Sequence, residues 1–211
     1  MKIKKEHYIY SGLLLFFLLH PVVLAGANDS NIIKLETYIA MDNYSQAEKF
    51  IKKIDLKVLS QNKQAEMYNK FGFIYYKLKE FQKALRYYLL AVKKDSKLYY
   101  VYNNIGVLYF HKGKYKQAKK YYLEALKYNS DYAKVMVNLA VVDFYLRNYK
   151  DSYNWYKKAK SVDKDYVKKR LDKKKALNKL EKLAKQYPDD KELQKLLKWA
   201  KANYTNKELF E

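Results

Sequence analysis

A spacing of 34 residues constrains this sequence more than any other feature. Gly72 and Gly106 are 34 positions apart, and a shift of that length aligns residues 65–98 with 99–132 and 133–166. Six positions recur in the three segments, which hold in order Phe71, Ile105 and Leu139; Gly72, Gly106 and Ala140; Phe81, Tyr115 and Tyr149; Ala84, Ala118 and Ser152; Tyr88, Tyr122 and Tyr156; and Ala91, Ala125 and Ala159. Copies that follow one another without insertions predict stacked units, none of which buries its core alone.

The pattern inside each segment is helical. Two apolar stripes of helical period flank a break near the middle, which predicts two antiparallel helices. The small residues let these helices approach closely, and the aromatic residues fill the space around them. Only 5 Gly and 2 Pro occur in 211 residues, too few turn formers for an all-β chain. Hydrophobic residues make up 49%, so a net charge of +22 does not predict disorder. We therefore expect an all-α fold of stacked hairpins.

The three segments resemble tetratricopeptide repeats (TPRs). The resemblance implies a TPR-type helical-hairpin solenoid, a right-handed superhelix with three full repeats (65–98, 99–132 and 133–166) and degenerate flanking hairpins. One position departs from it. Asp143 occupies the place of Tyr75 and Tyr109, where the family has a buried tyrosine. A carboxylate there needs a partner, and we expect a neighbouring lysine to supply it.

Both flanks read as degenerate units. Upstream, residues 28–64 contain an apolar helix over 32–41 and a second helix that begins near Tyr44. Downstream, residues 167–203 form a basic degenerate repeat and a final capping helix with lysines on its outer face, followed by a tail at 204–211. Asp189 and Glu192 are spaced as a capping box for that last helix.

The first 27 residues have the layout of a secretory signal peptide. A lysine-rich start precedes an apolar stretch, and Ala25-Gly26-Ala27 provides small residues for cleavage before Asn28. We expect an exported protein, periplasmic or associated with the cell envelope. The alternative is an uncleaved N-terminal membrane anchor, because residues 8–27 are just long enough to span a bilayer.

Residues that carry catalysis are scarce. The chain has no cysteine, and after residue 27 its one histidine is His111. It contains no glycine-rich phosphate loop, metal-binding His–Glu motif or nucleophile elbow. We therefore expect no enzyme, no cofactor and no metal site.

The resemblance instead implies protein binding. In TPR proteins, defined positions of each first helix line a concave groove, which makes the chain a non-catalytic adaptor or scaffold for a partner protein or peptide segment. Asn104 and Asn138 share one repeat position, and side-chain amides can pair with a peptide main chain of any sequence. The predicted groove residues are Asn69, Lys70, Phe73, Tyr76, Tyr100, Asn103, Asn104, Val107, Phe110, Lys134, Asn138, Val141 and Phe144.

Positive charge is densest between residues 157 and 185. This basic patch favours an alternative function, attachment to anionic membrane lipid or to an envelope polymer. Solvated surface lysines from a biased composition are a strong alternative explanation, and export argues against a nucleic-acid partner. The residues of the patch are Lys168, Lys169, Arg170, Lys173, Lys174 and Lys175.

Overall fold

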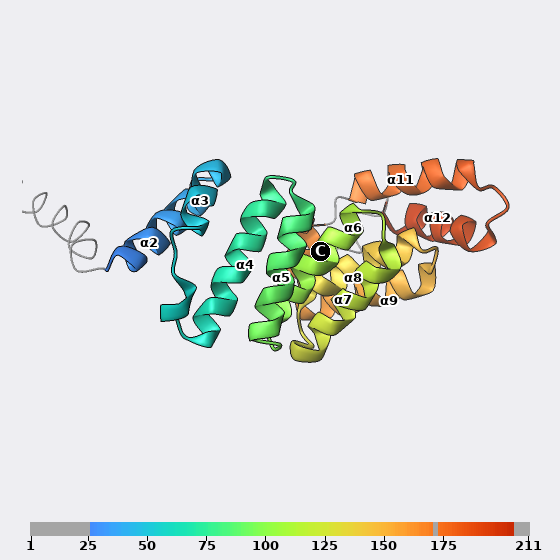
Figure 1. Ribbon diagram of the computed structural model, residues 1–211. Helices are drawn as coiled ribbons and strands as arrows, with labels where there is room; N and C mark the ends of the chain where they lie inside the picture. The colour runs from blue at the N-terminus through green and yellow to red at the C-terminus, as the bar shows by residue number, and fades with distance from the viewer. Residues whose placement is uncertain (1–25, 171–172, 205–211) are drawn as a thin grey trace, which may run out of the picture. The chain divides into compact units, whose positions relative to one another are not determined.

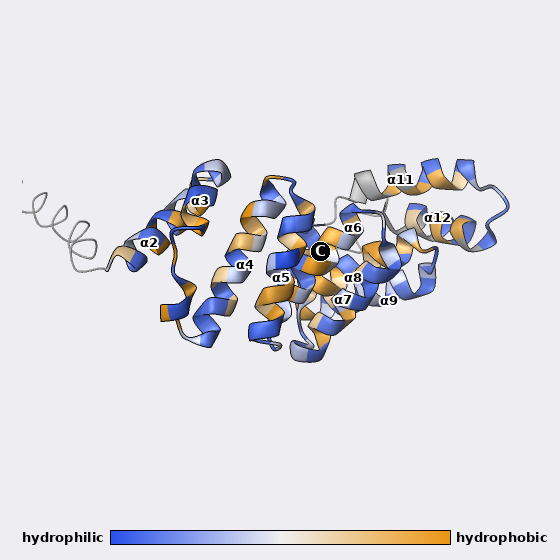
Figure 2. Ribbon diagram, in the orientation of Figure 1, coloured by the Kyte–Doolittle hydropathy of each residue, from blue (hydrophilic) through white to orange (hydrophobic). Residues whose placement is uncertain are grey.

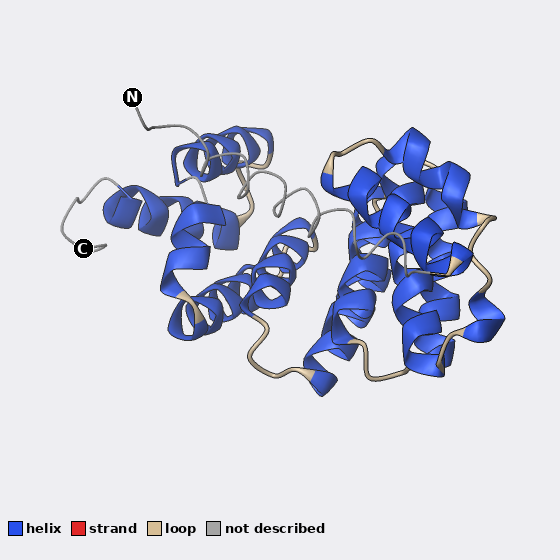
Figure 3. Cartoon of the chain, turned by 90° about the vertical axis from the view of Figure 1, so that its left-hand side faces the viewer, coloured by secondary structure: helices blue, strands red, loops and turns tan. Residues whose placement is uncertain are grey.

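The computed structural model describes residues 26–170 and 173–204, and every regular element within these ranges is helical (Figures 1 and 3). The all-α expectation is confirmed. The chain divides into two compact units, Met1–Lys94 and Asp95–Glu211, which we call unit 1 and unit 2. Hydrophobic and hydrophilic residues alternate along each helix at short intervals, as one buried face per helix requires (Figure 2).

The described residues of unit 1, from Gly26 on, form two helical hairpins. α2 pairs with α3, and α4 pairs with α5. α4 begins four residues before the first predicted repeat, and the Ser60 side chain caps it by accepting a hydrogen bond from the Lys63 N–H at 3.4 Å. The elements of unit 1 are α2 (Ala27–Ala40), α3 (Tyr44–Ile51), the short 3-10 helix η1 (Leu56–Val58), α4 (Gln61–Lys77) and α5 (Phe81–Lys94).

Within residues 95–170 and 173–204, unit 2 has three hairpins and one short helix. α6 pairs with α7, α8 with α9, and α11 with α12, while the short α10 packs against α8 and α9. α6 and α8 begin at the first residue of the second and third predicted repeats. The elements of unit 2 are α6 (Tyr99–His111), α7 (Tyr115–Tyr128), α8 (Ala133–Tyr145), α9 (Tyr149–Val162), α10 (Lys164–Arg170), α11 (Lys173–Gln186) and α12 (Lys191–Tyr204).

Close contact between the two helices of a hairpin explains the recurring glycines. A Cβ added to Gly72 would lie 2.5 Å from the Tyr88 ring, and one added to Gly106 would lie 2.5 Å from the Tyr122 ring. Both rings are almost fully buried. Only a residue without a side chain lets the tyrosine lie flat against the opposite backbone.

Four hairpins turn in the same way. One residue of each turn has a positive φ, and the next residue donates its backbone N–H to a carbonyl five positions earlier, as Lys114 does to Tyr109 at 2.9 Å. Glycine adopts this conformation without strain, but three of the four residues are not glycine. They are Asp42 (φ 54°), Lys79 (φ 63°), Gly113 (φ 69°) and Arg147 (φ 61°).

The predicted cap of the last helix is wrong by one residue. The Asp190 carboxylate, not that of Asp189, accepts the Leu193 N–H at 3.0 Å. α12 begins at Lys191, so Glu192 is its second residue and not the third, which a capping box uses. Val167 of the short α10 packs with Met136, Val137 and Ala159 of the α8–α9 hairpin. The capping role of the last helix stays a prediction.

The predicted signal peptide or anchor falls on residues 1–27, of which the structure describes only the last two. α2 begins at Ala27, next to the predicted cleavage site. None of the helices within the described ranges is long and apolar enough to cross a membrane. The tail at 205–211 also lies outside the described residues.

Candidate functional site

The predicted groove residues of unit 1 lie on α4, where two of them contact the preceding hairpin. The Lys70 ammonium forms an ion pair with Glu36 of α2. The Phe73 ring meets Tyr44 of α3 edge-on at 5.8 Å between centroids. Asn69 and Tyr76 are half-buried on the same helix. Lys70 and Phe73 therefore connect helices within unit 1.

In unit 2, three of the predicted residues form a chain of amides across α6 and α8. The Asn138 amide donates to the Asn103 side-chain oxygen at 2.8 Å. The Asn103 amide in turn donates to the Asn104 side-chain oxygen at 3.3 Å. Asn103 was expected to face the groove, but it is only 1% exposed. It is a buried link that fixes the orientation of Asn104 and Asn138, which are half-buried.

Aromatic residues continue this surface toward the turns. The Phe110 ring lies 5.3 Å from Tyr145 and 5.5 Å from Tyr115. Phe144 lies 5.6 Å from Tyr149 in an edge contact. Both phenylalanines are half-buried, so each has one side in the protein and one side accessible. Rigid rings of this kind provide apolar contact area at a small entropic cost.

The remaining predicted residues of unit 2 lie on the same two helices. Tyr100 and Val107 are half-buried on α6, Val141 is half-buried on α8, and Lys134 is exposed near the start of α8. We call the predicted groove residues on α6 and α8, together with the buried link Asn103, the amide–aromatic surface. Its members are Tyr100, Asn103, Asn104, Val107, Phe110, Lys134, Asn138, Val141 and Phe144.

The predicted basic patch divides between two helices. Lys168, Lys169 and Arg170 form the exposed last turn of α10. Lys173, Lys174 and Lys175 begin α11, and their side chains lie outside the described residues. Two further lysines of α9 lie over aromatic rings, Lys157 at 4.9 Å from the Tyr153 centroid and Lys158 at 5.6 Å from that of Trp155.

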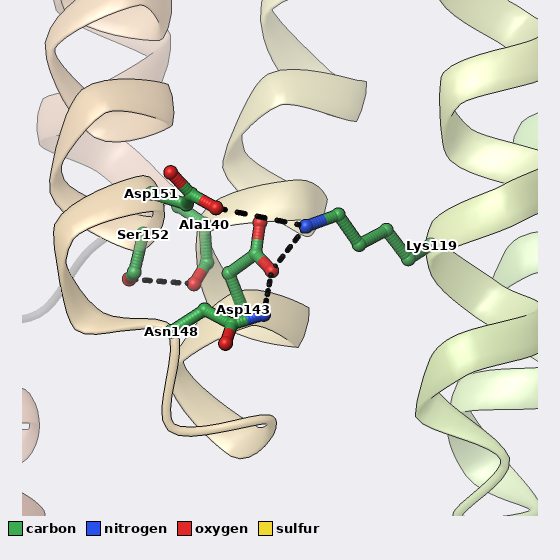
Figure 4. A network of polar contacts seen from close by, with 6 residues as sticks. All are labelled: Lys119, Ala140, Asp143, Asn148, Asp151 and Ser152. Carbon is green, nitrogen blue, oxygen red and sulfur yellow. Dashed lines mark hydrogen bonds and ion pairs between the residues drawn. The ribbon is translucent and has the colours of Figure 1, made fainter.

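A buried polar cluster surrounds Asp143, as expected from its odd place in the repeat (Figure 4). Asp143 is 0% exposed. Its Oδ1 accepts a hydrogen bond from the Lys119 ammonium of α7 at 2.6 Å and another from the Asn148 side-chain amide at 3.1 Å. The predicted lysine partner is confirmed. The other oxygen, Oδ2, is buried and accepts no hydrogen bond from the described residues. A half-satisfied carboxylate makes this cluster sensitive to loss of its lysine.

Metal-binding groups are dispersed over the part of the chain that the structure describes. No three histidine, aspartate or glutamate side chains gather there in a way that could hold a metal ion. His111 is exposed at the end of α6. The candidate functional site among the described residues is therefore the amide–aromatic surface.

Comparison with known proteins defines the class of the fold. Models of the tetratricopeptide repeat match residues 65–97 and 99–132. No curated protein sequence matches the chain significantly. The chain thus contains tetratricopeptide repeats and has an all-helical, repeat-built fold.

Solved structures agree with this class. A structure of MamA has a TM-score of 0.60 at 18% identity, covering 71% of this chain and 86% of that one. A second MamA structure gives 0.58 at 18% identity, with 68% and 77% covered. YrrB, described as a TPR protein with an unusual peptide-binding site, gives 0.58 at 17% identity, with 67% and 71% covered. At these identities the likeness shows a shared fold.

Proposed function

We propose that this protein is a non-catalytic adaptor of the cell envelope that binds a partner polypeptide on the amide–aromatic surface of unit 2. Tetratricopeptide repeats support an interaction role, as does the peptide-binding site described for the similarly folded YrrB. Export to the envelope rests on the signal-peptide layout of residues 1–27.

The observation that carries this proposal is the amide chain from Asn138 through Asn103 to Asn104. A side-chain amide has two donor hydrogens and two acceptor lone pairs, more than its neighbour in this chain uses. Asn138, which donates to Asn103, can therefore also pair with a peptide main chain, and Asn104 places a second amide on the same surface. Because Asn103 holds them, little side-chain entropy is lost when a peptide binds.

The test is a double substitution, Asn104→Ala with Asn138→Ala, in the chain that starts at Asn28. A partner is first captured from envelope extracts and identified by mass spectrometry, and its affinity is then measured with purified protein. We expect the double variant to bind at least about tenfold more weakly, since each lost hydrogen bond costs about 0.5–1.5 kcal/mol. Asn154→Ala, an exposed amide on α9, is the matched control and should bind like wild type.

The same variant has a stability cost that the melting temperature must report. Asn138→Ala leaves the buried Asn103 oxygen without its donor, which costs about 1–3 kcal/mol. Binding is therefore compared at a temperature where both proteins are folded. Undiminished binding by the folded double variant would show that the amides do not hold the partner.

A second candidate function has its own observation, the exposed cationic turn Lys168, Lys169 and Arg170. Under this alternative the protein attaches to anionic lipid or to an acidic envelope polymer. Sedimentation with phosphatidylglycerol vesicles should then occur at low salt and disappear at high salt, because exposed charges are screened. Substitution of these three residues by Gln should abolish it, whereas the Asn variants should not.

A further inference from the structure

The C-terminal part of unit 2 contains two apolar clusters with different roles. In the first, Val167 of α10 packs with Met136, Val137 and Ala159 and covers the end of the α8–α9 hairpin. In the second, the buried residues Leu180, Ala184, Leu193 and Ala200 join α11 to α12 and reach Tyr149. α10 therefore covers residues near the open end of the α8–α9 hairpin, whereas α11 and α12 cover Phe144 and Tyr149 beside its turn.

The docked hairpin covers one end of the amide–aromatic surface. Phe144, the last aromatic residue of that surface, packs against the second cluster, together with Leu177, Leu183, Leu196 and Leu197. Tyr149, at the start of α9, is itself buried in this cluster, and burial together with the Asp190 carboxylate raises its pKa. Phe110, at the corresponding position one repeat earlier, packs against Tyr115 and Tyr145.

A single arginine connects the hairpin to the turn between α8 and α9. The Arg147 guanidinium lies 4.0 Å from the Tyr187 ring centroid and 3.8 Å from an Asp190 carboxylate oxygen. Arg147 has a φ of 61°, a conformation that glycine adopts at Gly113, one repeat earlier. A residue with a side chain strains the backbone at this position. The contacts of Arg147 with Tyr187 and Asp190 offset part of that cost.

The hairpin also has internal polar contacts that hold it together. The Gln194 side chain of α12 donates to the Ala184 carbonyl of α11 at 2.9 Å. Lys201 and Glu181 form an ion pair between the same two helices at 3.1 Å. Because leucines and these two polar contacts join α11 to α12, the two helices can separate from α8 and α9 as one body.

We propose that the α11–α12 hairpin is a built-in competitor for the partner, held over Phe144 and Tyr149 by Arg147. The proposal rests on the proposed function, because it assumes that the amide–aromatic surface binds the partner. When Arg147 releases Tyr187 and Asp190, the hairpin undocks and exposes the Phe144 end of that surface. Partner binding and hairpin docking then exclude each other.

Arg147→Gly tests this in the intact protein, because it removes the contacts and relieves the strained φ at once. We expect hydrogen–deuterium exchange in residues 177–200 to accelerate about fivefold or more, with unchanged exchange in α6 and α7. Tyr187→Ala should have the same effect without altering the turn. Lys79→Gly, at the same turn position in unit 1, is the matched control and should leave exchange in α11 and α12 unchanged.

A synthetic peptide of residues 173–204 probes the uncovered surface. It should bind the Arg147→Gly protein about fivefold more tightly than wild type, and a scrambled peptide of equal charge should not distinguish them. Unchanged exchange in both Arg147→Gly and Tyr187→Ala would overturn the proposal, as would faster exchange throughout unit 2 or equal peptide affinities.

The two proposals fail in different ways. If a captured partner depends on Asn104 and Asn138 but binds wild type and Arg147→Gly equally, the competitor is wrong and the adaptor stands. If no captured protein depends on these amides, the adaptor on this surface is wrong, and with it the competition.

Discussion

The α6–α7 and α8–α9 hairpins are consecutive repeats in unit 2, yet different chemistry holds them together. In α6–α7 the Tyr122 ring lies against Gly106, and Tyr109 stacks on Tyr121 at 5.2 Å. In α8–α9, Ala140 stands at the position of the glycine, and Asp143 stands at the position of the stacked tyrosine. Ser152 of α9 donates to the Ala140 carbonyl at 2.7 Å, where α7 has the apolar Ala118.

The difference shows which repeat depends on its neighbour. The α6–α7 hairpin also packs against α8, but through apolar residues alone: Ala118, Tyr122 and Ala125 share a core cluster with Val135, Leu139 and Val142. The Asp143 carboxylate of α8 instead needs Lys119, which belongs to α7. The third repeat thus carries a buried charge that a lysine of the second repeat neutralises. Correct docking of the two hairpins is therefore a condition for the stability of α8–α9.

The largest expected effect comes from breaking this dependence. Lys119→Met leaves Asp143 buried without a counter-charge, and we expect unfolding to become easier by about 3 kcal/mol or more. The double variant Lys119→Met with Asp143→Leu should recover most of the loss, because apolar residues can replace a buried ion pair without cost. Urea denaturation measures both. A single variant as stable as wild type would show that the pair contributes nothing.

A smaller effect is expected from the glycine of the apolar repeat. Gly106→Ala places a methyl group 2.5 Å from the buried Tyr122 ring, which should cost about 1–3 kcal/mol despite the better helix propensity of alanine. The reverse change in the polar repeat, Ala140→Gly, should cost about 1 kcal/mol or less, through propensity alone. Equal urea midpoints for the two variants would contradict the difference in packing.

Ser152→Ala gives the third repeat the alanine that the second repeat has at this position, Ala118. The lost hydrogen bond to the Ala140 carbonyl should cost about 1 kcal/mol, since that bond is partly buried. Ser161→Ala removes a similar bond, to the Lys158 carbonyl at 2.8 Å, but on the exposed end of α9. This control should change the urea midpoint less than Ser152→Ala does.

The smallest effect concerns alkaline pH. Burial and the adjacent Tyr128 raise the pKa of Tyr102 to about 12, above its ordinary value of 10.0. The unfolded chain therefore loses this proton first as pH rises, so stability is lost between pH 10 and 12. The third repeat has Met136 at this position, which does not titrate. Because this ring is partly exposed and solvent screens it, Tyr102→Phe should reduce the loss by only about 1 kcal/mol or less, measured from urea midpoints at both ends of that range.

Much of the fold could be predicted from the sequence, because the residues that define each repeat lie at fixed, short spacings. Gly106, Ala118 and Tyr122 recur in register with other repeats, and that register predicted helical hairpins and the close contact between their helices. The same comparison identified Asp143 as the position that needs a lysine. An individual hairpin is defined over about 30 residues, so its sequence contains most of what its geometry requires.

The tertiary structure decided what depends on contacts between hairpins. No spacing rule distinguishes a groove amide from a buried one, and only packing of α6 on α8 shows that Asn103 is the buried link between Asn104 and Asn138. The partner of Asp143 lies 24 residues earlier, in another repeat, among many equally plausible lysines. Arg147 likewise contacts Asp190, which follows it in the chain only after α9, α10 and α11. Sequence periodicity determines which face of a helix is apolar, but side chains from distant segments meet only when the chain is folded, and these meetings decide which polar groups are buried.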